Sequence, residues 1–267
     1  MASIITSDIT LDHLTQLTDL ARLVVDPKKT EAYYRWKYFD NLDKQSLGRC
    51  ALENQRVIGN HGSVPVQLQL GASVCSGAQL VDAMVSPEFR RLGIFTTLSQ
   101  ETDGKMARAG VQVAFVFPAP VTLKALTHKL GDWGWVHVAN VPRLVCIVDA
   151  LRAAKSVTAP AARLPYALWL HGISSVMGST SVGRGTSPIT LEEVTAFDER
   201  FDKLWLRASP GLGFSVSRTA SYLQWRYHRH PEKEYRCLAV SSTNTLNAYI
   251  VLCELELQRV PTWELVE

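Results

Sequence analysis

The pattern of hydrophobic and polar residues changes its period along the first half of this chain. After one short strand, leucines recur at helical spacing, at Leu11, Leu14, Leu17 and Leu20. Ser7 or Asp8 is the expected cap of this first helix. A second helix carries Tyr34, Trp36 and Tyr38. The opening 45 residues are therefore predicted to be mainly helical.

From Arg49 onward, short apolar runs replace the helical period. They lie at 50–52, 57–58, 64–70 and 80–85, with Gly or Asn between them. Runs of this length joined by turn residues are typical of consecutive antiparallel strands. The pattern then predicts a helix over 94–109, a strand over 111–117, a helix over 121–130 that ends at Gly131, and two closing strands over 135–138 and 144–148.

A short aromatic motif occurs twice in the chain. Tyr34-Arg-Trp-Lys-Tyr38 precedes Arg49-Cys50, and Leu223-Gln-Trp-Arg-Tyr227 precedes Arg236-Cys237 at nearly the same distance. Leu80-Val81-Asp82 lines up in the same way with Leu265-Val266-Glu267. Chance is the alternative for matches this short, but order, spacing and chemistry agree over about 35 residues.

The repeat predicts a duplicated chain with three parts. Residues 1–149 form a first domain, and 150–188, rich in Ala, Ser, Gly and Pro, form a linker with one helix. Residues 189–267 form an incomplete second copy.

Composition narrows the classes of protein that fit. The chain has 267 residues, 46% of them hydrophobic, and a net charge of +3. This balance argues against a dedicated nucleic-acid surface. The longest apolar stretch is too short to cross a bilayer, and the first residues lack a secretory pattern. The five cysteines are Cys50, Cys75, Cys146, Cys237 and Cys253. Their odd number and wide spacing predict buried thiols in a reducing, cytoplasmic setting.

Residues 79–98 combine an apolar strand, a tight basic turn and the start of a helix. Pro87 ends the strand, and Gly93 permits a close turn of the backbone. The first amides of a helix have no carbonyl partner within it and lie at the positive end of its dipole, so they bind phosphate groups. Arg90 and Arg91 add positive charge at the same place. This segment is predicted to hold a diphosphate.

Pro87-Glu-Phe-Arg-Arg-Leu-Gly-Ile-Phe95, placed between a strand and a helix, resembles the GNAT superfamily of acyl-CoA-dependent N-acyltransferases. The resemblance covers roughly residues 5–148, including the later helix that ends in Lys-Leu-Gly. The family signature is Arg or Gln, two variable residues, Gly, one variable residue, then Gly or Ala. Arg90 and Gly93 fit it, and Phe95 departs at the last position. The alternatives are an ordinary strand-to-helix turn, or a dinucleotide fold, whose Gly-x-Gly-x-x-Gly spacing is absent.

The resemblance implies an α+β fold with a mostly antiparallel central sheet and helices on both faces. It implies that strands 80–85 and 111–117 splay apart around the pantetheine arm of acetyl-CoA. The residues expected to bind this co-substrate are Met84, Val85, Arg90, Arg91, Leu92, Gly93, Ile94, Phe95 and Thr96. No metal is expected, the acceptor is a small-molecule or peptide amine, and neither a nucleic acid nor a membrane is a partner.

Acyl transfer from a thioester needs a neutral amine, a held carbonyl and a proton for the leaving thiolate. Asp82 is the one carboxylate in the apolar strand that leads to the turn, so it is the candidate general base. The alternative is that Asp82 only caps or hydrogen-bonds a neighbouring strand or turn. Glu88 lies in the exposed turn and is less suited.

The usual proton donor of the family is missing. Many GNAT enzymes carry a Tyr about four residues before the Gly that closes the second helix, but Thr127 or Leu130 occupies that place here. His128 is a possible substitute, although a lone surface His is the commoner case. Trp133 and Trp135 either line the cleft or pack, and repetition of the Tyr34, Trp36 and Tyr38 motif favours core packing for those rings.

These observations lead to one main hypothesis and one alternative. The main hypothesis is an N-acetyltransferase that moves an acetyl group from acetyl-CoA to a primary amine. The alternative is a non-catalytic module of the same fold that binds acyl-CoA or serves a structural role.

Overall fold

The computed structural model describes residues 3–129, 134–141, 163–165, 168, 189–257 and 260–266. The chain divides into two compact units, one of Met1–His137 with Ala196–Lys233 and one of Val138–Thr195 with Glu234–Glu267. This division differs from the predicted segments because the helices of 196–233 group with the N-terminal unit. The predicted linker and the 144–148 strand lie almost entirely outside the described residues.

The first unit opens as the sequence predicts. Strand β1 (Ile4–Asp8) is followed by a 3-10 turn (Leu11–His13), helix α1 (Leu14–Val24) and helix α2 (Glu31–Tyr38). The predicted cap is wrong, because Ser7 and Asp8 belong to β1. Thr10 takes that position instead and forms a capping box, in which its amide donates to Nδ1 of His13.

The central sheet is an antiparallel meander with one parallel addition. Its strand order is β1-β2-β3-β4-β5, and β7 pairs with β3. The bounds are β2 (Arg49–Glu53), β3 (Arg56–Leu70), β4 (Ser73–Val85), β5 (Val113–Phe115) and β7 (Phe214–Val216). β5 runs parallel to β4. The meander is confirmed, but the runs at 57–58 and 64–70 are one strand of 15 residues, because the Gly-Asn-His-Gly segment between them pairs with both neighbours rather than turning.

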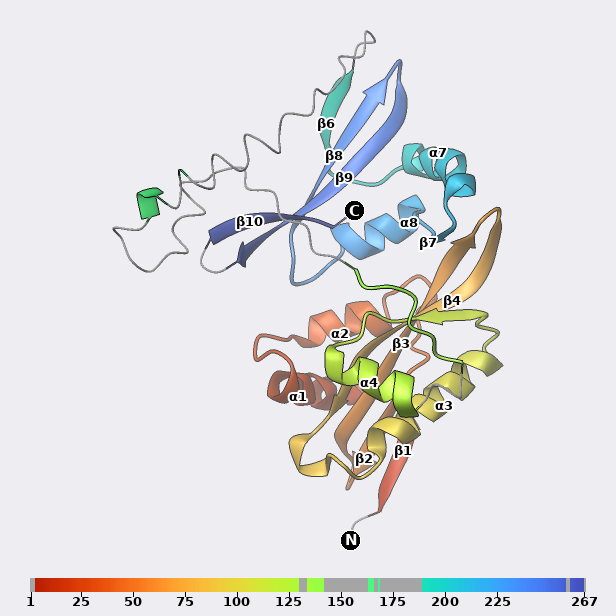
Figure 1. Cartoon of the computed structure of the whole chain (residues 1–267), viewed down its shortest axis with the longest axis vertical. Helices are drawn as coiled ribbons and strands as arrows, with labels where there is room; N and C mark the ends of the chain where they lie inside the picture. The colour runs from red at the N-terminus through yellow and green to blue at the C-terminus, as the bar shows by residue number, and fades with distance from the viewer. Residues whose placement is uncertain are drawn as a thin grey trace. The chain divides into compact units, whose positions relative to one another are not determined.

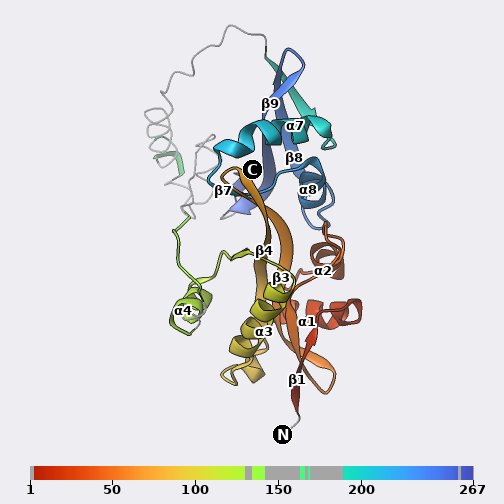
Figure 2. The ribbon, with the colours of Figure 1, turned by 90° about the vertical axis from the view of Figure 1, so that its right-hand side faces the viewer.

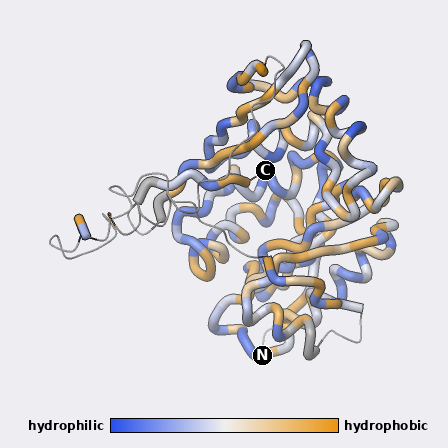
Figure 3. The backbone as a smooth tube through the Cα atoms, turned by 45° about the horizontal axis from the view of Figure 1, so that its top comes forward, coloured by the Kyte–Doolittle hydropathy of each residue, from blue (hydrophilic) through white to orange (hydrophobic). Residues whose placement is uncertain are grey.

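Helices cover both faces of this sheet (Figures 1 and 2). Helices α1 and α2 lie on one face, while α3 (Ile94–Arg108) and α4 (Pro120–Lys129) lie on the other. Figure 3 shows hydrophobic residues running along the strands and mixed with hydrophilic ones on the helices. The sheet is thus buried on two sides, and the predicted α+β fold with helices on both faces is confirmed.

The segment that follows α4 is not a strand. Residues 135–138 have no strand pairing, contrary to the prediction. Trp135 packs against the cluster of α3 and β5 and hydrogen-bonds Asp103, whereas Val136 and Val138 are 77% and 91% exposed. A strand needs a paired neighbour, and the described residues offer none here. Gly131 lies outside the described residues.

The rest of the first unit comes from the second half of the chain. It consists of α7 (Glu199–Ala208), a 3-10 turn (Ser209–Gly211), β7, α8 (Ala220–Leu223) and a π-helical turn (Gln224–His228). The aromatic motif predicted to be helical, 223–227, is confirmed as the end of α8 and this π turn.

The second unit contains a four-stranded antiparallel sheet in the order β10-β9-β8-β6. The strands are β6 (Thr190–Val194), β8 (Tyr235–Ser242), β9 (Thr245–Leu257) and β10 (Val260–Leu265). Apart from the short strand β7, the order of β6, two helical segments and the meander β8-β9-β10 repeats that of β1, α1, α2 and β2-β3-β4. This order supports the predicted duplication, which stays a prediction.

Two findings bear on the expected setting of the protein. No helix among the described residues is both long and apolar enough to cross a membrane. Cys50, Cys237 and Cys253 are buried free thiols, while Cys75 is half-buried rather than buried as predicted. Cys146 lies outside the described residues.

Candidate active site

Strand β4 has a bulge at Asp82. Asn60 of β3 pairs with Met84 and Gly62 pairs with Val81, so β4 has one residue more than β3 over this stretch. Asp82 itself has a φ of 51°, in the left-handed region. A bulge with a left-handed residue re-aims the side chain and ends regular pairing. The predicted base therefore lies at an irregular point in an otherwise regular strand.

The carboxylate of Asp82 is held by two side chains of α2. Nζ of Lys37 lies 3.1 Å from Oδ1 and 3.0 Å from Oδ2, and the hydroxyl of Tyr38 donates to Oδ2 across 2.8 Å. The side chains of the ion pair are only 10% and 17% exposed. The partners of this carboxylate lie on a helix, whereas the alternative to a catalytic role expected a neighbouring strand or turn, so that alternative also stays a prediction. The role of base stays a prediction.

Both partners of Asp82 stay protonated. Burial is the largest single influence on Lys37 and opposes its charge, but Asp82 and Tyr33 together outweigh it, so the pKa of Lys37 is raised. Burial, with the nearby Asp82 charge, raises the pKa of Tyr38 well above its usual value. Asp82 thus receives hydrogen bonds from groups that remain donors at every physiological pH. Sequence reasoning missed Lys37, whose one signal was a cation within an aromatic run.

Strands β4 and β5 part just before the bulge. They pair only at Gly77–Gln79 with Val113–Phe115. Beyond Gln79, no described strand covers this edge of β4, so backbone groups of Leu80–Val85 can meet a ligand there. Met84 is 2% exposed and packs with α1 and α2, which leaves only its backbone for that edge. A pantetheine arm in this gap, with Met84 and Val85 as backbone partners, stays a prediction.

The turn between β4 and α3 has the backbone that a phosphate cradle needs. Arg91 and Gly93 both have positive φ, at 67° and 80°. The first helical hydrogen bond runs from the Thr97 amide to the Gly93 carbonyl at 3.0 Å. The amides of Ile94, Phe95 and Thr96 precede this bond at the positive end of the helix. Arg90, Arg91 and Leu92 are exposed beside them.

Phe95 departs from the family signature without filling the turn. Its ring meets the ring of His61 edge-on, with centroids 5.7 Å apart. His61 is 3% exposed, and burial lowers its pKa to about 4, so this imidazole is neutral. The large side chain at this position is therefore accommodated by packing against β3.

The proton-donor side of the site is less complete. Thr127 and His128 lie in α4, but their side chains are outside the described residues, as are Leu130 and Trp133. Nε1 of Trp135 donates to Oδ2 of Asp103 across 3.2 Å. Burial raises the pKa of this carboxyl, although the hydrogen bond opposes the shift. Sequence reasoning did not single out Asp103.

The aromatic residues of α2 are core residues, as predicted. Tyr34, Trp36 and Tyr38 are 1%, 3% and 0% exposed. Trp36 stacks on Trp225 with ring centroids 5.0 Å apart. Tyr38 has the additional contact with Asp82 that its aromatic character did not reveal.

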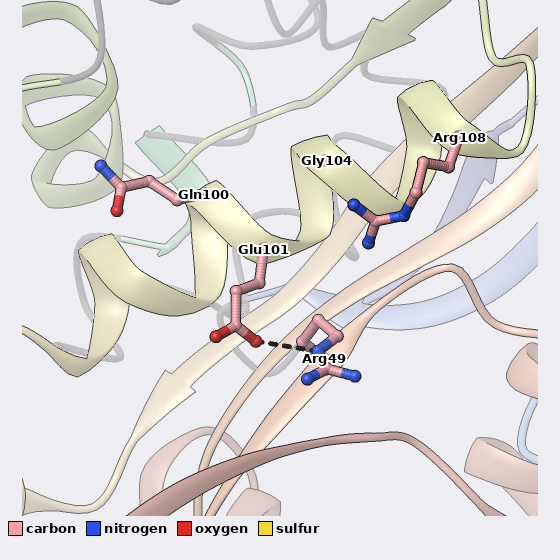
Figure 4. Close-up of a pocket in the computed structure, with 5 residues that line it drawn as sticks. All are labelled: Arg49, Gln100, Glu101, Gly104 and Arg108. Atoms are coloured by element: carbon pink, nitrogen blue, oxygen red, sulfur yellow. Dashed lines mark hydrogen bonds and ion pairs between the residues drawn. The ribbon is translucent and has the colours of Figure 1, made fainter.

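A separate pocket lies between α3 and Arg49 of β2 and contains none of the predicted site residues (Figure 4). It has a volume of about 290 Å³ and is lined by Arg49, Gln100, Glu101, Gly104 and Arg108. Arg49 is paired with Glu101 at 2.9 Å within it. Within the described part of the chain, no group of three His, Cys, Asp or Glu residues is arranged to hold a metal ion.

Comparisons with known proteins identify the family. Residues 6–136 match the family model described as "Acetyltransferase (GNAT) domain". This part of the chain therefore belongs to the GNAT superfamily, as the sequence resemblance implied. No curated protein matches the sequence.

Solved structures agree with this fold over nearly the whole chain. A GCN5-related N-acetyltransferase from Anabaena variabilis aligns with 99% of this chain and 58% of its own, at 13% identity and a TM-score of 0.64. A probable N-acyltransferase from Enterococcus faecalis aligns with 94% of this chain and 55% of its own, at 13% identity and a TM-score of 0.60. Both proteins are much longer than this chain.

A third similar structure comes from a eukaryote. N-myristoyltransferase of Saccharomyces cerevisiae with bound myristoyl-CoA covers all of this chain with 59% of its own length, at 10% identity and a TM-score of 0.54. At these identities the likeness shows the fold alone.

Proposed function

We propose that this protein is an acyl-CoA-dependent N-acyltransferase that moves an acetyl group from acetyl-CoA to a primary amine. The observation that carries the proposal is the turn at 86–93. Its left-handed Arg91 and Gly93 lead directly into the first amides of α3, and the strand before it has an edge that no described strand covers beyond Gln79. The pyrophosphate of the cofactor would bind the amides at the start of α3. Its pantetheine arm, which ends in the thioester, would bind along the edge of β4.

In this proposal Asp82 accepts the proton of the incoming amine. Its carboxylate lies at the bulge of the strand that would hold the thioester, and it is paired with the ammonium of Lys37. A base within hydrogen-bond reach of the amine accelerates transfer by removing the proton as the new bond forms. The leaving thiolate takes its proton from solvent, since the usual Tyr is absent.

One observation favours the second candidate, a non-catalytic module that binds acyl-CoA. Lys37 contacts both oxygens of Asp82, so the carboxylate already has an ammonium partner. A carboxylate used only to pin α2 to β4 would look the same. The two functions differ in turnover but not in cofactor binding.

Two measurements separate them. Isothermal calorimetry with acetyl-CoA tests the turn, and thiol release over a panel of primary amines tests transfer. Asp82→Asn is expected to lower turnover at least tenfold while acetyl-CoA affinity stays within about twofold. Glu88→Gln, in the exposed turn, is the matched control and should change neither.

The outcomes are distinct. Acetyl-CoA binding without release of thiol on any amine would favour the non-catalytic module. A wild-type protein that binds no acetyl-CoA would overturn both functions. An unaltered pH–rate profile in Asp82→Asn would remove Asp82 from the mechanism.

A further inference from the structure

Lys37 and Tyr38 are neighbours on α2, and both side chains end on the same carboxylate. Within the described part of the chain, Oδ2 of Asp82 accepts from Lys37 and Tyr38, whereas Oδ1 accepts only from Lys37. An ionised carboxylate offers about four acceptor positions. Since three are used, one remains, and it is on Oδ1.

The direction of the Asp82 side chain is fixed from β3 as well. Nδ2 of Asn60 donates to the Asp82 carbonyl at 2.8 Å and to the Tyr38 hydroxyl at 3.3 Å. A side chain at Gly62 would clash with that hydroxyl and with the Val81 carbonyl. The absence of a side chain there lets Tyr38 reach the bulge across β3.

The charged and titratable groups around Asp82 all come from one helix. Among the described residues they are Lys37, Tyr38 and Tyr34, and β3 contributes the uncharged Asn60. Burial and the Asp82 charge raise the pKa of Tyr34, which stays neutral. Lys37 is therefore the one positive charge that these elements direct at Asp82.

We infer that Lys37 and Tyr38 are positioning residues for acyl transfer: they hold Asp82 so that one Oδ1 acceptor position is left for the incoming amine. Lys37 has a second effect on that amine. An ammonium bound at Oδ1 would lie close to the Lys37 ammonium, and two like charges disfavour each other. The acceptor is thereby shifted to its neutral, nucleophilic form. This inference rests on the proposed function.

The transfer step balances without any change in Lys37. The ammonium gives its proton to Oδ1 of Asp82, and the amine nitrogen attacks the thioester carbonyl. A C–N bond forms, the nitrogen releases a second proton to solvent, the C–S bond breaks, and the thiolate takes a proton from solvent. Asp82 then returns its proton to water. The products are an amide, a free thiol and one released proton.

The test compares Lys37→Met, Lys37→Arg and Tyr38→Phe in the full chain, with acetyl-CoA and the most reactive amine of the panel. In Lys37→Met the acidic limb of the kcat profile should move up by at least one pH unit, a tenfold change in proton affinity. Lys37→Arg keeps the charge and should restore the wild-type profile to within about 0.3 units. Acetyl-CoA affinity, measured by calorimetry, should stay within about twofold.

Tyr38→Phe is a second variant that tests the same inference if Lys37→Met does not fold. It removes one donor to Oδ2 with little change in shape, and the acidic limb should move up by at least about half a unit. A carbon-13 titration of the Asp82 carboxyl, assigned with Asp82→Asn, should follow the same order without turnover.

Two negative results are separable. Wild-type protein with no turnover on any amine overturns the proposed function and this inference with it. Turnover by folded variants whose pH profiles and carboxyl titrations match the wild type overturns this inference alone, because a purely structural contact would move neither.

Discussion

Trp36 and Trp225 exchange hydrogen bonds in both directions. Nε1 of Trp36 donates to the carbonyl of Trp225 at 2.9 Å, and Nε1 of Trp225 donates to the carbonyl of Trp36 at 3.1 Å. The rings stack at 20°. These two residues hold the same position in the two aromatic motifs, so the equivalent helices of the predicted duplication meet through a reciprocal contact. That reciprocity is the strongest structural support for the duplication.

Trp225→Phe is expected to lower the free energy of unfolding by about 1–3 kcal/mol. Phenylalanine keeps an aromatic ring at this position, although a smaller one. The buried carbonyl of Trp36 loses its hydrogen-bond donor, and an unsatisfied buried polar group costs about 1–3 kcal/mol. Urea unfolding followed by circular dichroism measures the change. Trp263→Phe, at a residue 48% exposed, is the control and should stay within about 0.5 kcal/mol of the wild type.

A double-mutant cycle makes the test of Trp36 and Trp225 stricter. If the two hydrogen bonds act as one unit, Trp36→Phe with Trp225→Phe costs less than the sum of the single changes, by about 0.5 kcal/mol or more. Additive costs would show that the two bonds are independent.

The turn before α3 was predictable from sequence because its physics is local. Pro87, Arg90 and Gly93 each impose a backbone conformation or a charge on the next few residues, and the helix start follows from them. The network around Asp82 was not predictable. Lys37 and Asp82 are 45 residues apart in the sequence. Their contact depends on the bulge in β4, and no residue type in that strand predicts a bulge.

The length of β3 was also not predictable from local sequence, because it depends on pairing with distant strands. Gly59, Asn60 and Gly62 have the composition of a turn, and the sequence pattern predicts one. The structure keeps them in β3, because β2 and β4 both pair with Gly59 and Asn60, and β4 pairs with Gly62. Glycine serves here to make room for Tyr38 rather than to turn the chain.

Gly62→Ala should therefore destabilise the fold by about 1–3 kcal/mol, since the added carbon must displace Tyr38 or the backbone of β4. Gly104→Ala is the matched control. It lies inside α3 with its nearest neighbour 3.5 Å away, and it should stabilise the protein by about 0.5–1 kcal/mol. Urea midpoints of the two variants are expected on opposite sides of the wild type. Equal midpoints would show that the Tyr38 side chain moves aside without lowering the free energy of unfolding.

His61 predicts a pH dependence of stability. Burial lowers its pKa from 6.5 to about 4 in the folded protein. Between these two pH values His61 is protonated in the unfolded chain and neutral in the folded protein. Stability is therefore lost as the pH falls, by about 2 kcal/mol between pH 7 and pH 5 for this group. His61→Gln should remove that loss, whereas His228→Gln, at an exposed residue, should retain it. Urea unfolding at the two pH values measures the difference. The same pH slope in all three proteins would contradict the assignment of His61 as a neutral buried group.

Gly93 offers the sharpest test of the cradle, because its requirement is backbone conformation and not space. A side chain there would meet nothing within 4 Å, yet φ is +80°. Left-handed backbone is tolerated best by Asn, less by Ala and least by a β-branched residue, at a cost of about 1–3 kcal/mol. Acetyl-CoA affinity should fall in the order Gly93→Asn, Gly93→Ala and Gly93→Val, with binding abolished in the last. Gly213→Val has the same free space without a positive φ and should bind acetyl-CoA like the wild type. Calorimetry that finds the same affinity in Gly93→Val would place the phosphate site elsewhere.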